Sequence, residues 1–150
     1  MAVEARSLPM RAWMHVAALV FVVCCPPIAR DAEALMPMPL TDTVWSWRST
    51  AAANGSVTPV STPDLYTVQL VSDGTVRVRA DCNRGAGTYR SNDVELRFER
   101  IGTTKRGCPS GSRGAEFVAA LARIESYRFE GTDLLAIGGG ATLRFRPQGS

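Results

Sequence analysis

Apolar and polar residues alternate along much of the chain after residue 64. Apolar side chains occupy every second position in the segments 66–70, 76–80, 94–99 and 142–146, and the residues between them are polar or charged. Successive side chains of a strand point to opposite faces, so this period predicts antiparallel strands with one buried and one solvated face. Further strands are expected at 44–47, 88–90, 126–130 and 134–137, with a short one near Val57.

Turn residues and one helical pattern complete the predicted fold. Turns are expected at 72–74, 83–87, 91–93 and 138–140, where Gly, Asn, Asp or Ser gather. One helix is predicted over 115–125, because apolar residues recur there at helical spacing. About eight short strands and one helix indicate a mainly β (α+β) fold, a small antiparallel β-barrel or half-barrel with one covering helix.

The first 34 residues differ from this pattern. Arg6 and Arg11 precede an apolar run over 12–25, which Pro26 and Pro27 end. This layout is typical of a secretory signal peptide, and the run is shorter than the roughly 20 residues that a membrane-spanning helix needs. An uncleaved membrane anchor is the alternative.

Small residues at alternate positions, Ala32 and Ala34, place the expected cleavage after residue 34. We therefore expect a signal peptide over 1–34, a flexible arm over 35–41 and one folded domain over 42–148, with no transmembrane segment in the mature chain. The expected location is periplasmic or secreted. A lipid anchor on Cys24 or Cys25 is less favoured, because Val23 rather than a small residue precedes Cys24.

The distribution of charge along the chain argues against one class of partner. The chain has 17 Lys and Arg against 14 Asp and Glu, a net charge of +3. The basic residues alternate along the strands with acids nearby and form no long block, which is typical of a solvated sheet face. We therefore expect no nucleic-acid partner.

The positions of the single histidine and of the cysteines limit the kinds of catalytic and metal sites that the chain can form. The single histidine, His15, lies in the predicted signal peptide, so an exported chain would lose Ser-His-Asp catalysis, Cys-His catalysis and His-based zinc sites. We expect no catalytic residue, metal or cofactor. Cys82 and Cys108 remain, and an even pair in an exported domain predicts a disulfide; two buried free thiols are the alternative.

Two sequence motifs carry a family resemblance. The segment from Ala80 to Tyr89 reads ADCNRGAGTY, and that from Ile101 to Pro109 reads IGTTKRGCP. Together with Trp45, Glu116 and the strands around them, they resemble the META domain (HslJ-like) family of bacterial envelope proteins over residues 42–147. Asp81 is a departure, since many members have Gly there.

The resemblance implies a compact β-barrel-like domain with a helix, commonly exported and without an assigned enzymatic activity. Some members are associated with heat-shock or drug-stress phenotypes. The family-motif cluster, which is either structural or a binding surface, comprises Asn83, Arg84, Gly87, Tyr89, Thr104, Pro109 and Glu116.

We expect a non-catalytic, monomeric extracytoplasmic domain that binds an unknown envelope protein or small ligand, or supports the envelope under stress. Within the motif, Arg84 either holds an anion or is simply solvated, and solvation is favoured. One alternative function is a barrel that binds lipid or a hydrophobic small molecule, which requires an unfilled apolar cavity. Another is an inhibitor resembling periplasmic lysozyme inhibitors, which requires an exposed loop able to plug an active site.

Overall fold

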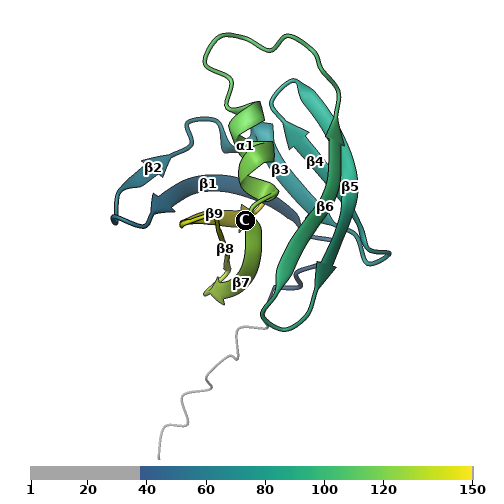
Figure 1. Ribbon diagram of the computed structural model, residues 1–150, viewed down its shortest axis with the longest axis vertical. Coiled ribbons are helices and arrows are strands. Elements are labelled where there is room, and N and C mark those ends of the chain that lie inside the picture. Colours follow the sequence, from purple (N-terminus) through teal and green to yellow (C-terminus); the bar gives the residue numbers. More distant parts are fainter. Residues whose placement is uncertain (1–37, 150) are drawn as a thin grey trace, which may run out of the picture. The chain divides into compact units, whose positions relative to one another are not determined.

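The alternating segments form nine strands in a computed structural model that describes residues 38–149 (Figure 1). These residues lie within one compact unit, residues 34–150. The predicted signal peptide lies outside the described residues. The elements are β1 (Val44–Ala52), β2 (Val57–Pro59), a 3-10 turn η1 (Pro63–Leu65), β3 (Tyr66–Leu70), β4 (Thr75–Ala80), β5 (Asn83–Ser91), β6 (Leu96–Thr103), α1 (Gly114–Leu121), β7 (Ile124–Glu130), β8 (Asp133–Gly138) and β9 (Ala141–Pro147).

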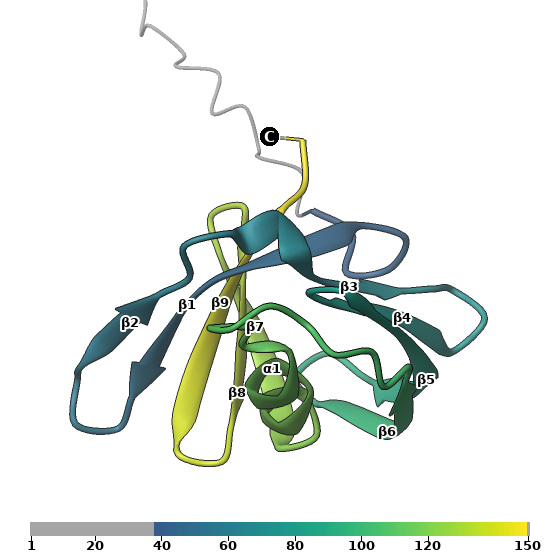
Figure 2. The same cartoon turned by 90° about the horizontal axis from the view of Figure 1, so that it is seen from above.

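The strands form one antiparallel sheet that curls into a half-barrel. Its order is β6-β5-β4-β3-β1-β9-β8-β7, and β2 pairs with β1 outside this path. The end strands meet at one point, where the Tyr127 amide donates to the Val94 carbonyl (2.9 Å) and Glu95 bridges to Ser126. Figure 2 shows α1 lying between the β3–β6 arm and the β7–β9 arm of the sheet. The predicted half-barrel with a covering helix is confirmed.

Aromatic rings fill the space between the helix and the sheet. Trp47 and Phe117 are fully buried and stack with their centroids 5.2 Å apart. Tyr66 meets the edge of Trp47 at 5.8 Å, and Phe145 lies 6.2 Å from Phe117. These rings come from three strands and the helix, so they hold α1 against the sheet through apolar burial and ring contacts.

Three local predictions were wrong. Residues 83–87 belong to β5 and not to a turn, so the β4–β5 turn is only Asp81-Cys82. The helix ends at Leu121, and Ile124 begins β7. The strand predicted from Val94 starts only at Leu96, where β6 begins. Val94 therefore lies before the strand, and its side chain is 62% exposed.

Part of the predicted arm packs on the domain. Met38 and Leu40 lie against the hydrophobic core, and the Leu40 carbonyl accepts a hydrogen bond from the Trp45 indole (3.0 Å). The Asp42 amide donates to Leu70 (2.6 Å). These contacts tie the residues before β1 to the start of the sheet.

The two-residue β4–β5 turn depends on an unusual backbone. Asp81 has a φ of +61°, the left-handed region that glycine adopts without steric cost. We expect Asp81→Val to lower the free energy of unfolding by about 1–2 kcal/mol, because a β-branched side chain is strained there. Urea unfolding followed by circular dichroism would measure it. Asp81→Gly is the control and should retain the stability of the parent; equal losses in both variants would contradict a backbone cause.

Candidate functional site

A disulfide joins the β4–β5 turn to the segment 104–113 that leads into α1. Cys82 and Cys108 are linked with an S–S distance of 1.99 Å and Cα atoms 5.6 Å apart. The predicted disulfide is therefore confirmed. It fixes an irregular, largely exposed connection against the end of the sheet.

The Asn83 side chain organises the residues around this bond. Its Oδ1 accepts hydrogen bonds from the Thr104 hydroxyl and the Arg106 amide, both at 2.8 Å. Its Nδ2 donates to the Arg106 carbonyl (3.2 Å) and lies 3.1 Å from the Cys108 sulfur. One amide side chain thus satisfies backbone groups that the irregular segment 104–113 cannot pair by itself.

Thr104, the residue that follows β6, joins the same cluster to β5. Its hydroxyl accepts from the Arg84 amide (3.1 Å), and its own amide donates to the Arg84 carbonyl (2.9 Å). The Arg84 side chain is exposed on the outer face of the sheet. Arg84 therefore contributes its backbone to the disulfide cluster and its guanidinium to a different surface.

The remaining motif residues, Gly87, Tyr89 and Pro109, each make contacts outside the disulfide cluster. A Cβ on Gly87 would lie 2.8 Å from the Glu99 carbonyl oxygen, so close strand packing requires glycine there. The Tyr89 hydroxyl donates to the Val71 carbonyl (2.9 Å), and burial raises its pKa, as do Asp42 and Asp73. The Pro109 carbonyl accepts from Ser112 (3.2 Å) in an exposed turn.

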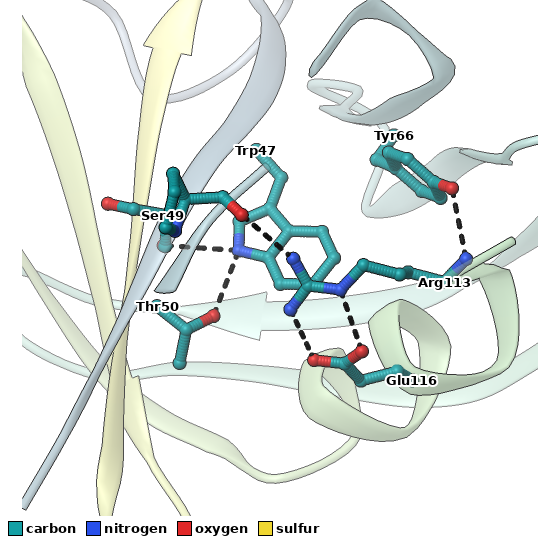
Figure 3. Close-up of polar contacts among 7 residues, drawn as sticks. Trp47, Ser49, Thr50, Tyr66, Arg113 and Glu116 are labelled. Atoms are coloured by element: carbon teal, nitrogen blue, oxygen red, sulfur yellow. Dashed lines mark hydrogen bonds and ion pairs between the residues drawn. The ribbon is translucent and has the colours of Figure 1, made fainter. Parts of the chain in front are cut away.

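Glu116 belongs to another cluster, at the start of α1 (Figure 3). It accepts two hydrogen bonds from the Arg113 guanidinium, at 2.8 and 2.6 Å. That guanidinium lies 4.4 Å from the centroid of the Trp47 ring, and the Arg113 amide donates to the Tyr66 hydroxyl (3.0 Å). A cation–π contact and a bidentate ion pair therefore anchor the helix start over the aromatic core.

The structure therefore separates the predicted motif residues. It brings Cys82, Asn83, Thr104 and Cys108 together and leaves Glu116 in the Arg113 cluster. The sequence analysis missed Arg113 as a site residue. The Arg-x-x-Glu spacing at the helix start was the only sequence signal for it, since residues three apart on a helix can interact.

A hollow lies between α1 and the ends of β4–β6. Its volume is about 470 Å³. Small helix residues line one side, and the motif cluster lines the other: Gly114, Ala115, Val118 and Ala119 face Asn83 and Thr104. Lys105 also lines it, so this is a mainly apolar hollow that includes one cation.

The sequence of this domain matches the model of a known protein family. The META domain model matches residues 38–150. The chain belongs to the META domain family. The predicted resemblance is thus confirmed, and the match covers the whole described domain.

Solved structures share the META domain's architecture. An NMR structure of a protein from Burkholderia xenovorans is 26% identical, with a TM-score of 0.61, over 81% of this chain and 97% of that one. A DUF4847 family protein from Bacteroides vulgatus is 16% identical, with a TM-score of 0.53, over 71% and 93%. The second likeness shows the fold alone. No curated protein matches this META domain.

Residues 38–149 contain neither a membrane-spanning helix nor a cluster of metal ligands. No helix among them is long and apolar enough to span a membrane. No three His, Cys, Asp or Glu side chains in this range gather where they would hold a metal ion.

Two carboxylates of the META domain and the two arginines paired with them have pKa shifts that favour their charged forms. The hydrogen bond from Arg113 lowers the pKa of Glu116, and that from Arg144 lowers the pKa of Glu130. Hydrogen bonds to these carboxylates and to Asp133 raise the pKa of both arginines. Each of these shifts moves the pKa further from neutral pH, whereas a general acid or base requires a pKa near it.

The Glu116 shift predicts an acid dependence of stability. A lowered pKa in the folded state contributes stability that is present above the ordinary value of 4.5 and is lost as the pH falls below it. Glu116→Gln is expected to flatten this part of the curve of melting temperature against pH and to leave its neutral limb with a similar slope. Glu125→Gln, at an exposed position, is the control. An unchanged acid limb in Glu116→Gln would contradict the assignment.

Proposed function

We propose that this META domain is an exported, non-catalytic binding domain of the bacterial cell envelope. The Cys82–Cys108 bond carries the proposal. Structural disulfides persist in oxidising compartments and are rare in the cytosol of ordinary bacteria. The motif residue Asn83 touches this bond, so the most distinctive part of the domain is built around it.

The non-catalytic part of the proposal rests on the available side chains. The single histidine of the chain is His15, which cleavage after residue 34 would remove. The shifted groups Glu116 and Glu130 are held in their charged forms by arginine. These features argue against acid–base catalysis, and we propose instead that the domain, as a monomer, binds a partner or supports the envelope under stress.

The two alternative functions depend on different parts of the domain. Stacked rings fill the centre of the region between α1 and the sheet, so a lipid or hydrophobic small molecule would have to bind in the mainly apolar hollow of about 470 Å³ at the ends of β4–β6. A lysozyme-inhibitor-like role is favoured by one observation: the exposed segment carrying Lys105 and Arg106 is pinned by Cys108. Inhibition of lysozyme by the purified protein, and its loss in Lys105→Glu/Arg106→Glu, would support that role.

Cell fractionation with intact mass measurement tests the main proposal. The full chain is expressed in a bacterial host, and each fraction is treated with an alkylating agent before and after reduction. We expect a periplasmic or secreted protein that begins near Leu35, lacks two hydrogens and is alkylated only after reduction. Full-length protein in the cytosol, with Cys82 and Cys108 both alkylated without reductant, would overturn the proposal.

A further inference from the structure

The outer face of β3–β6 gathers arginines that are scattered in the sequence. The strand register places Arg77 and Arg79 on β4 beside Arg84 on β5, and Arg90 on β5 opposite Arg97 on β6. We call these five residues the arginine face. They alternate with core-facing residues, so their side chains lie on the solvent side of the sheet.

Two pairs in the arginine face oppose like charges. Arg79 is the direct cross-strand partner of Arg84, and Arg90 that of Arg97. Like charges directly opposite each other destabilise a sheet. The face therefore carries an electrostatic cost in the free protein, which a bound anion would offset.

On the β7–β9 arm of the sheet, by contrast, carboxylates neutralise the arginines of the strands. On the outer face of β7–β9, Arg144 and Arg146 both contact the buried carboxylate of Asp133, at 2.7 and 3.1 Å. On the arginine face, within the described chain, Glu99 forms the one salt bridge, with Arg90 (3.1 Å). Among residues 38–149, no carboxylate lies within salt-bridge range of the other four arginines of this face, Arg77, Arg79, Arg84 and Arg97.

One end of the arginine face is hollowed. A depression of about 260 Å³ is lined by Arg77, Arg79 and Arg84, together with the side chains of Thr67 and Gln69. Asp64 is the one carboxylate in this lining. Guanidinium groups bind phosphate through paired N–H donors, so the hollow suits one phosphate group.

We propose that the arginine face docks the domain on an anionic phospholipid bilayer, with one headgroup phosphate in the hollow. The arginines spread over three neighbouring strands and along β5 from Arg84 to Arg90, which is a two-dimensional array. A single small anion would occupy the hollow and leave the Arg90–Arg97 pair opposed. A bilayer presents phosphates across a surface and reaches both pairs.

The proposal deepens the proposed function by naming a partner for the envelope domain. Its test does not depend on export, because it is performed on protein made from the full chain and purified from whichever cell fraction holds it. Failure of export and failure of membrane docking therefore give separate results.

Vesicle co-sedimentation measures the docking. One set of vesicles contains equal parts of phosphatidylglycerol and phosphatidylcholine, and the other contains phosphatidylcholine alone. A basic residue near an anionic surface strengthens binding roughly fivefold. We therefore expect Arg79→Gln/Arg84→Gln to weaken binding to the anionic vesicles about 25-fold, and salt to weaken binding of the parent.

A matched double variant distinguishes the effect of where the arginines lie from the effect of net charge. Arg123→Gln/Arg128→Gln removes the same charge from exposed positions outside the arginine face and should bind within about twofold of the parent. The melting temperature of Arg79→Gln/Arg84→Gln should be equal to that of the parent or higher, because an opposed pair is removed. A merely structural role for these arginines would lower it.

Three results would overturn the proposal. They are equal binding to both kinds of vesicle, equal loss of binding in the two double variants, and tighter binding of a DNA duplex with the same dependence on Arg79 and Arg84. The last result would assign the arginine face to a nucleic acid instead.

Discussion

Trp47→Ala is expected to lower the free energy of unfolding by about 3–5 kcal/mol, the usual cost of truncating a buried aromatic residue. The Trp47 ring is fully buried, stacks on Phe117 and meets the edge of Tyr66. It also supports the Arg113 guanidinium at 4.4 Å. Its loss would open a cavity at the point where strand, helix and the Arg113 cluster meet.

Chemical denaturation followed by far-ultraviolet circular dichroism would measure this effect. Single domains are stable by only about 5–15 kcal/mol, so the variant should unfold at a much lower urea concentration or be unfolded without it. Val57→Ala, at a position that is 63% exposed, is the control and should change stability by less than about 1 kcal/mol. A similar small effect for Trp47→Ala would show that the ring stack does not hold the fold together.

Removing the disulfide with Cys82→Ser/Cys108→Ser is expected to cost roughly 3–4 kcal/mol. The two cysteines are 26 residues apart, so the bond restricts a sizeable loop in the unfolded chain. In the folded chain, the Asn83 hydrogen bonds to Thr104 and Arg106 would still hold the connection. We therefore expect a less stable domain with the same fold.

Reductant supplies the internal control for this prediction. Unfolding of the parent protein measured in reductant should match the double serine variant, whereas reductant should leave the variant unchanged. Hydrogen exchange should increase most in residues 104–113, because these lose their covalent tie. Equal stability of the oxidised parent and the variant would contradict the loop-closure argument.

Strand alternation predicted most of the sheet, and the errors have a physical cause. Asn83, Gly85 and Gly87 are typical of turns, so the start of β5 was predicted as one. In the fold these glycines serve close packing: a Cβ on Gly85 would lie 2.7 Å from the Gly102 carbonyl oxygen. A residue's need for space against a distant strand is not visible in its local sequence.

In the candidate site, the disulfide was predictable from the sequence and the side-chain contacts around it were not. The pairing of Cys82 with Cys108 was predictable, because the predicted loss of residues 1–34 would leave only these two cysteines. The contacts of Asn83 were not, since they link residues more than 20 positions apart through one side chain. The stacking of Arg113 on Trp47 also depends on where the helix meets the sheet.

The seam between β6 and β7 has a consequence for assembly. Within residues 38–149, backbone pairing between these two edges is limited to the hydrogen bond from Tyr127 to Val94 and the bridge between Glu95 and Ser126, just before β6 begins. Unpaired strand edges can add a strand from another chain. The ring contacts of Phe117 hold α1 between the two arms of the sheet, so we expect a variant that loosens the helix to let the arms separate at this seam and to favour self-association through their edges. The aromatic core would in this way also protect the protein from polymerisation.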